Sequence, residues 1–560
     1  MKLTLLGLLA LALSALASNS SAAPASHALG SGAHRVEKRA SAPVVTLAQA
    51  RYKGSTGSGV DSFKGIPYVL APTGTRRWAT PAAITAKSTA TVAATSYGSK
   101  CTAAEDCLKL NVFRPAGTTA SSGLPVLVYF FGGSFSSGDA SAYNPTNLIK
   151  RGVATGQEAL VVTFNYRLGA LGFVNQVGGS STIKKNIGLY DQHAALEWIQ
   201  ANVAKFGGDP DKVTAWGQSA GAISIALQMF RSPTSPPFRA AILHSGAAGT
   251  VEVFDRTSSY STKQQSTAAR YATFLKAVGC STGSISCLRK ASFAKILVAQ
   301  AKVNAAAGGF PWGPVEDGAF LPGQPSALYA SGAFAQVPVI IGNVLDEGTL
   351  FINSGTYVGT PITTNTQVKH WIANMFTDQS STAIAALEAA YSDSQSAGSP
   401  YDTGATEYNW KKYKKVSSIF GDLAFTAPRR QFLNAAYARQ DCWTFLFAGP
   451  ASTTTAALGV GHGSDLEVAF AKIASPSSAE TTLTHAMNDY WLNFAATLNP
   501  NGDTVGSWSK WTYSGRAMKQ FGLGSATKSI TDDFRTAQTG KIVSNAESVR
   551  YRSYRVPILP

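Results

Sequence analysis

Residues 213–230 read VTAWGQSAGAISIALQMF, and this stretch decides the fold. Its first four residues are typical of a buried strand, the residues from Ala220 onward of a helix, and GQSAG of the turn between them. A G-x-S-x-G turn between a strand and a helix presents its serine, here Ser219, above the edge of a sheet. Such a turn crowds the backbone, so Gly217 and Gly221 stand where a side chain would not fit. The stretch predicts that Ser219 is a nucleophile.

The pentapeptide alone also fits an ordinary glycine-rich turn, so the surrounding pattern matters. Asp191–Ala204 has helical spacing, and apolar runs predict five more buried strands at Pro125–Phe131, Ala159–Tyr166, Phe238–Leu243, Val337–Ile341 and Cys442–Phe447. This alternation predicts an α/β fold with a large, mostly parallel central sheet and helices on both faces. Sites in such sheets form beyond the carboxyl ends of the strands, and every candidate residue below follows such a strand.

The N-terminus predicts a secreted protein. Residues 1–17 resemble a signal peptide, with Lys2 before an apolar run that is too short to span a membrane. Residues 18–39 form a leader that ends in the dibasic pair Lys38-Arg39, so we expect a mature chain that begins near Ala40. Residues 45–550 contain no repeat or long linker, and we expect residues 40–560 to form one domain. We expect no stable insertion in a membrane.

The formal net charge of +17 does not point to a nucleic-acid partner, because the basic residues are scattered. The densest cluster consists of Lys411, Lys412, Lys414 and Lys415, interleaved with aromatic residues. We expect this cluster to be the solvated face of a helix and expect no nucleic acid to bind.

The five cysteines fall into two close pairs, Cys101 with Cys107 and Cys280 with Cys287, and a lone Cys442. In a secreted protein this spacing favours two short-range disulfides, with Cys442 as a buried free thiol. No C-x-x-C or H-E-x-x-H spacing occurs, so the sequence predicts no metal site and no cofactor.

A serine nucleophile needs a base, and five histidines follow the leader. His193, His370 and His485 lie in helical patterns, whereas His244 closes a strand near the expected site. His462 lies between glycines in a loop after the last long strand, which suits a mobile acid–base residue as well as a solvated one. The carboxylate that would orient the base is Asp346 or Glu347, and the spacing does not choose between them.

The oxyanion hole needs backbone N–H donors near the nucleophile. Ala220, the residue after Ser219, supplies one candidate donor. The loop Phe131–Phe135, which reads FGGSF directly after a predicted strand, supplies further candidates.

Taken together, these motifs resemble the type-B carboxylesterase/lipase family, the cholinesterase-like branch of the α/β-hydrolases, and its secreted fungal members above all. The resemblance extends from about residue 44 to Arg535. Its motifs run in family order, and they are FKGIPY at 63–68, EDCL at 105–108, NYRLG at 165–169, FGGDP at 206–210, the Ser219 turn, DEGT at 346–349 and HGS at 462–464.

The resemblance implies a role for each candidate. Ser219 would be the nucleophile, His462 the base and Glu347, rather than Asp346, the acid. The N–H groups of Gly133, Ser134 and Ala220 would hold the oxyanion, and the pairs Cys101–Cys107 and Cys280–Cys287 would match the two family disulfides. The implied activity is hydrolysis of small-molecule carboxylic esters by a secreted enzyme, through an acyl-enzyme intermediate.

Two departures from the family pattern bear on this activity. Many members have three glycines in the oxyanion loop, whereas this chain has Gly132-Gly133-Ser134. In fungal lipases of the family the first disulfide loop carries a long amphipathic lid, but only Thr102–Asp106 separate the two cysteines here. We therefore expect an esterase without an interfacial lid. The alternatives are a lipase or an esterase for bulky sterol, carotenoid or aromatic esters, and a non-catalytic adhesion module.

Overall fold

The structure is a computed structural model that describes residues 42–175, 183–254, 267–280, 284–307, 311–354, 361–375, 380–450 and 455–553. The expected signal peptide, the leader and the start near Ala40 lie outside the described residues, so these predictions stay untested.

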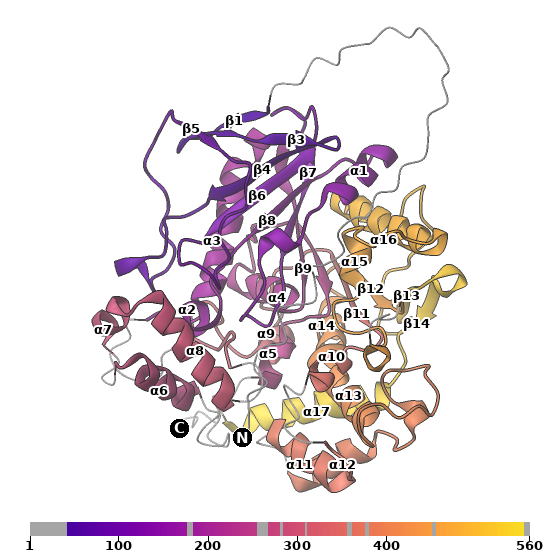
Figure 1. The fold of residues 1–560 in the computed structure, drawn as a ribbon. Coiled ribbons are helices and arrows are strands. Elements are labelled where there is room, and N and C mark those ends of the chain that lie inside the picture. The colour runs from indigo at the N-terminus through magenta and orange to yellow at the C-terminus, as the bar shows by residue number, and fades with distance from the viewer. Residues whose placement is uncertain are drawn as a thin grey trace, which may run out of the picture. The chain divides into compact units, whose positions relative to one another are not determined.

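A large twisted sheet organises the described residues (Figure 1). Across the sheet, its eleven strands are β14 (Lys528–Thr531), β13 (Ala517–Phe521), β12 (Cys442–Phe447), β11 (Val339–Val344), β10 (Ala240–His244), β9 (Gly208–Gln218), β7 (Leu124–Phe130), β8 (Leu160–Phe164), β6 (Lys109–Pro115), β4 (Val60–Pro67) and β3 (Ser55–Gly57). The strands from β13 to β8 pair in parallel. Antiparallel pairs occur only toward the two edges of this sheet, which the sequence patterns did not predict.

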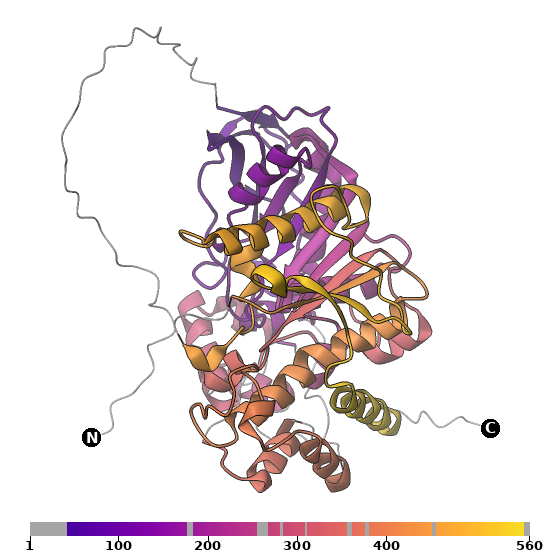
Figure 2. The same ribbon diagram turned by 90° about the vertical axis from the view of Figure 1, so that its right-hand side faces the viewer.

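The central strands are apolar because helices bury both of their faces. α3 (Ile187–Asn202) and α4 (Ala220–Arg231) cover one face, and α1 (Thr146–Thr155) and α16 (Ser478–Thr497) cover the other (Figure 1). Figure 2 shows α16 running across the strands of its face. This helix begins at a capping box, in which Ser477 and Glu480 satisfy each other's backbone N–H groups. The predicted α/β architecture is confirmed.

The connections after β10 and β11 build the part of the molecule beyond the carboxyl ends of the strands. They contain α5 (Gly249–Phe254), α6 (Thr267–Val278), α7 (Ile285–Lys290), α8 (Phe293–Ala307), α9 (Pro325–Ser331), α10 (Thr349–Asn353), α11 (Asn365–Met375), α12 (Ser381–Ala389), α13 (Tyr413–Gly421), the π-helix Asp422–Thr426 and α14 (Ala427–Ala436). α2 (Gly169–Phe173), α15 (Asp465–Ala469), α17 (Thr536–Ser553) and a small sheet of β1 (Val44–Thr46), β2 (Arg51–Lys53) and β5 (Thr91–Ala93) complete the described elements apart from short 3-10 turns. Within the described ranges, no helix has the length and apolar content needed to cross a membrane.

Only Lys411 of the lysine cluster is exposed, so the prediction of a solvated helix face is wrong. Lys412, Lys414 and Lys415 are all buried, and Lys414 is 1% exposed. Lys415 pairs with Glu388 and Asp393 from α12 and the segment after it, and Lys412 also contacts Asp393, at 2.6 Å. Periodicity alone could not reveal these acidic partners, which arrive from a distant part of the chain.

Both predicted disulfides, Cys101–Cys107 and Cys280–Cys287, are present, and Cys442 is a buried free thiol. Burial raises the pKa of the Cys442 thiol, which keeps it protonated. Arg77 connects the two disulfide-bearing segments: its guanidinium binds Glu105 in the first loop and donates to the carbonyl of Ala291 after α7.

Candidate active site

Ser219 lies at the turn between β9 and α4, with a φ of 55° and a ψ of −127°. This left-handed conformation is costly for a residue with a side chain and is found where the surroundings enforce it. The turn needs both of its glycines, because neither position has space for a side chain. A Cβ on Gly221 would lie 1.9 Å from the carbonyl oxygen of Phe130, and one on Gly217 would lie 2.7 Å from the backbone of Gly221. The turn therefore has the geometry that the pentapeptide predicted.

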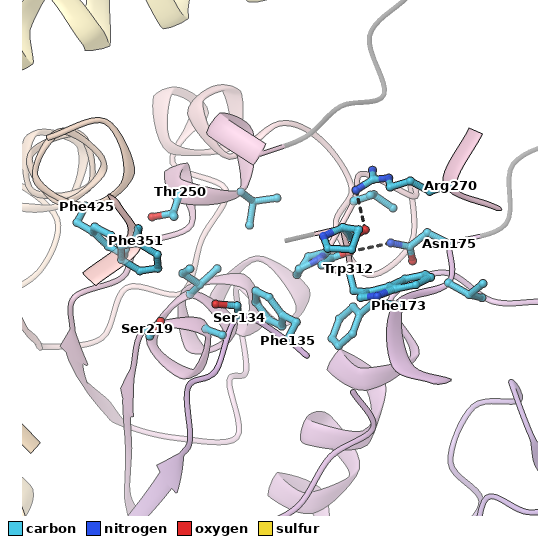
Figure 3. A pocket seen from close by; sticks show the side chains of 18 residues that line it. Ser134, Phe135, Phe173, Asn175, Ser219, Thr250, Arg270, Trp312, Phe351 and Phe425 are labelled. Atoms are coloured by element: carbon cyan, nitrogen blue, oxygen red, sulfur yellow. Dashed lines mark hydrogen bonds between the residues drawn. The ribbon is translucent and has the colours of Figure 1, made fainter. Parts of the chain in front are cut away.

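The glycine-bearing loop after β7 packs directly against this turn. A Cβ on Gly132 would lie 2.9 Å from the Cβ of Ser219, so any larger residue would push the loop away. Gly133 has a φ of 110°, and Ser134 adopts a φ of 55° despite its side chain. Ser134 and Ser219 line the same pocket (Figure 3), which brings the candidate oxyanion loop beside the candidate nucleophile.

His462 binds Glu347, which follows β11. The distance from Nδ1 of His462 to Oε2 of Glu347 is 2.6 Å. The other carboxylate oxygen accepts hydrogen bonds from the Asn343 amide and from the N–H of Val344, and Glu347 is only 3% exposed. A carboxylate held in this way fixes both the orientation and the tautomer of the imidazole, with the proton on Nδ1.

Asp346, the alternative acid, faces away from His462. Its carboxylate accepts hydrogen bonds from the Ser399 hydroxyl and from the N–H groups of Tyr401 and Val460. Burial raises its pKa to about 6 in spite of these donors. Through Val460, these contacts hold the backbone in place two residues before His462. Of the two candidate acids, only Glu347 binds the imidazole.

Gln218 is a site residue that the sequence analysis missed. Its side-chain amide donates to Nε2 of His462, with a nitrogen-to-nitrogen distance of 3.1 Å. Ser219 and His462 are both among the described residues, and no hydrogen bond joins their side chains. Gln218 therefore occupies the lone pair that a general base at this position would use.

Two phenylalanines pack against the imidazole, and no motif identified them either. The ring centres of Phe425 and Phe351 lie 4.6 and 5.0 Å from that of His462. Phe425 belongs to the π-helix Asp422–Thr426, an irregular turn of a kind that is frequent at functional sites. No local pattern could identify them, because both residues lie far from His462 in the sequence.

The pocket has a volume of about 810 Å³, including space open to solvent, and its lining is mainly apolar. In Figure 3, Phe351 and Phe425 stand on one side of Ser219 and Ser134, and Trp312, Asn175 and Arg270 stand on the other. Asn175 and Arg270 donate to the backbone carbonyls of Gly313 and Pro311, which fixes the Trp312 loop. The pocket can therefore accept an apolar group beside Ser219.

Comparison with known proteins agrees with this geometry. The sequence matches the model of the carboxylesterase family over residues 41–540. The chain belongs to the carboxylesterase family. This carboxylesterase is 33% identical to a secreted triacylglycerol lipase of Gibberella zeae, over 91% of this chain and 92% of that one.

Solved structures of esterases share the fold of this carboxylesterase. The crystal structure of Aspergillus niger EstA matches it with a TM-score of 0.76 and 26% identity, over 90% of this chain and 98% of that chain. The structure of a PNB esterase matches with a TM-score of 0.74 and 27% identity, over 89% and 99%. The resemblance to the α/β-hydrolases of this family is thus confirmed, and this carboxylesterase is a carboxylic ester hydrolase.

Proposed function

We propose that this carboxylesterase is a secreted serine hydrolase that uses Ser219, His462 and Glu347 to cleave carboxylic esters through an acyl-enzyme. The observation that carries the proposal is the 2.6 Å contact between His462 and the buried Glu347, beside a serine held in a strained strand-to-helix turn. Both neighbours of the imidazole support the same tautomer: Glu347 accepts the proton on Nδ1, and the Gln218 amide donates to an unprotonated Nε2.

In the proposed reaction, Nε2 of His462 takes the proton of the Ser219 hydroxyl while Oγ attacks the ester carbonyl carbon. The amide of Gln218 has to release Nε2 for this step. The tetrahedral intermediate collapses when His462 returns the proton to the leaving alcohol, which leaves an acyl group on Ser219. Water then attacks the acyl-enzyme with the same proton transfers and regenerates the serine.

The N–H groups of Gly133, Ser134 and Ala220 are the proposed donors to the oxyanion. Ala220 is the first residue of α4, so its N–H has no partner within the helix, and the dipole of the helix favours negative charge there. Ser134 retains its N–H although it replaces a glycine of the family pattern. One such donor is worth about a hundred- to a thousandfold in rate.

We further propose an esterase without an interfacial lid, although relatives are named lipases. The first disulfide loop has only the residues Thr102–Asp106 between its cysteines, too few for a two-turn amphipathic helix. Glu105 in that loop is bound to the buried Arg77, which restrains it further. A lipase is the second candidate function, and it is supported by the name of the Gibberella relative.

The experiment is a series of p-nitrophenyl esters from acetate to palmitate, measured below and above the micellar limit with Ser219→Ala as the control. We expect preference for short, dissolved esters, no activity in the variant, and labelling of Ser219 by an organophosphate. A jump in rate at the micellar limit would favour the lipase. An unlabelled but folded protein without activity would favour an adhesion module.

Secretion is tested separately. The leader and the secreted relative support a chain processed after Lys38-Arg39. N-terminal sequencing of protein from the culture medium should begin near Ala40, and a start well before it would contradict the proposed processing.

A further inference from the structure

A second histidine–carboxylate pair lies in the core behind the site. Nδ1 of His244 and Oδ2 of Asp465 are 2.6 Å apart, and both residues are 0% exposed. The other oxygen of Asp465 is also buried and has no hydrogen-bond partner in the part of the chain that the structure describes. Loss of the contact with His244 would leave this buried carboxylate with no hydrogen-bond partner among the described residues. Because an unpaired buried charge is strongly destabilising, the contact is favoured.

Two tryptophans fix the tautomer of His244 in this pair. The indole N–H groups of Trp216 and Trp491 both point to Nε2 of His244, at 3.1 and 3.0 Å. An indole nitrogen can only donate, so Nε2 is an acceptor and the proton lies on Nδ1, toward Asp465. Because both nitrogens of His244 are engaged in this way, the imidazole has one orientation and one tautomer.

The position of the pair along the chain relates it to the proposed catalytic residues. His244 is the last residue of β10, opposite Gln218 in the strand register, and its backbone carbonyl accepts the N–H of Ser219 at 2.9 Å. Asp465 is the first residue of α15 and comes three residues after His462. A single residue, His244, thus touches the nucleophile turn through its backbone and the histidine loop through its side chain.

The loop that bears His462 is held at both ends by buried carboxylates. Before His462, the carboxylate of Asp346 accepts the N–H of Val460 at 2.8 Å. After it, Asp465 accepts the N–H of His244 from the sheet. Between these two anchors lie glycines at 461 and 463, which restrain the backbone little by themselves.

We propose that His244 and Asp465 are positioning residues that set the distance between the Ser219 turn and the imidazole of His462. The inference rests on the proposed function, because it assigns these two residues to the same proton transfer. Neither residue touches the pocket. Displacement of a catalytic group by about 1 Å costs on the order of a hundredfold in rate, so loss of this tie should lower kcat and leave KM nearly unchanged.

The experiment compares two replacements of His244 in the full chain. His244→Gln keeps a donor for Asp465. His244→Phe keeps an aromatic ring at this position but removes both hydrogen-bonding nitrogens. We expect kcat to fall by about threefold to tenfold in the glutamine variant and by about a hundredfold in the phenylalanine variant, with KM within twofold. Asp465→Asn keeps a carbonyl acceptor for the Nδ1–H of His244, so it should resemble the glutamine variant. His193→Gln is the matched control and should be unchanged, because His193 is a half-buried histidine on α3 that does not line the pocket.

Removal of His462 distinguishes the proposed positioning role of His244 from a merely structural one. In His462→Ala, added imidazole can replace the missing base without the loop, so His244→Gln should not change the rescued rate by more than about twofold. Where imidazole gives no rescue, the same comparison is made on the residual rates. A further tenfold loss from His244→Gln in that background, or wild-type kcat in a folded Asp465→Asn variant, would overturn the proposal. Full activity in Ser219→Ala or His462→Ala would instead overturn the proposed function.

Discussion

The molecule contains two histidine–carboxylate pairs of nearly equal geometry and very different surroundings. In both, Nδ1 lies 2.6 Å from a buried carboxylate oxygen. The difference is at Nε2, which in His244 accepts two indole N–H groups and in His462 accepts one side-chain amide. The His462 imidazole also packs against two phenylalanines that line the pocket. A carboxylate partner therefore does not by itself make a histidine a base, because the second nitrogen must also be able to reach a substrate proton.

The largest test of this comparison replaces the two histidines in turn. His462→Ala should lower kcat/KM by about a millionfold, because the loss of the serine or the histidine of such a triad costs about as much as the loss of all three members. His244→Phe should cost about a hundredfold. Both are measured with p-nitrophenyl butyrate on folded protein of matched thermal stability. We call His462 with Glu347 the open pair and His244 with Asp465 the sealed pair. Similar losses at the two positions would mean that the sealed pair takes part in the chemistry.

The next test replaces the adjacent carboxylates. Glu347→Gln should lower kcat by about ten-thousandfold, because an amide that donates toward Nδ1 favours the wrong tautomer of His462. Asp346→Asn should cost at most about tenfold in kcat, while it lowers the free energy of unfolding by about 1–3 kcal/mol through lost hydrogen bonds to its three donors. Steady-state kinetics and urea unfolding of both variants provide the comparison, and a reversed order of kcat would make Asp346 the acid.

The sequence alone predicted the open pair better than the sealed one. Ser219, Glu347 and His462 lie in short motifs in which local glycines, strand ends and family order carry the information. His244 was expected near the site from its place at the end of a strand, but its partner Asp465 was not identified. Strand β12 was predicted to the residue, since a strand buried on both faces is a continuous apolar run.

The failures at the lysine cluster and at the two phenylalanines share one physical cause, which is contact between distant segments. The lysines of 411–415 have helical spacing, but Lys412 and Lys415 are buried against Glu388 and Asp393, which no local pattern connects to them. Phe351 and Phe425 reach His462 from separate helices for the same reason. Gln218 was overlooked although it adjoins the nucleophile, because a spacer position in G-x-S-x-G carries no expected role.

A smaller effect is expected from the amide that faces Nε2 of His462. Gln218→Glu places a carboxylate about 3 Å from the imidazole, and a nearby negative charge favours the protonated form of histidine. The acidic limb of the profile of kcat/KM against pH should then move upward by about one unit or more, so that the rate at pH 6 falls and the rate at pH 9 changes little. Gln218→Ala is the control for lost contact: it removes only a donor to the neutral imidazole, so it should move the limb upward by less than the glutamate variant does. An unchanged limb in the glutamate variant would show that position 218 does not face the working base.

The smallest effect concerns the oxyanion loop, which only the open pair has beside it. Ser134 holds a φ of 55° with a side chain in the pocket, and glycine adopts this conformation without the cost of about 1–2 kcal/mol. Ser134→Gly retains the N–H donor, so kcat/KM for p-nitrophenyl acetate should change by less than about tenfold, while branched acyl groups gain from the space that is freed. The ratio of kcat/KM for p-nitrophenyl pivalate to that for the acetate measures this gain. A loss of a hundredfold or more on both esters would instead identify the Ser134 hydroxyl as an oxyanion donor, and the open pair would then differ from the sealed one by a side chain as well as by access.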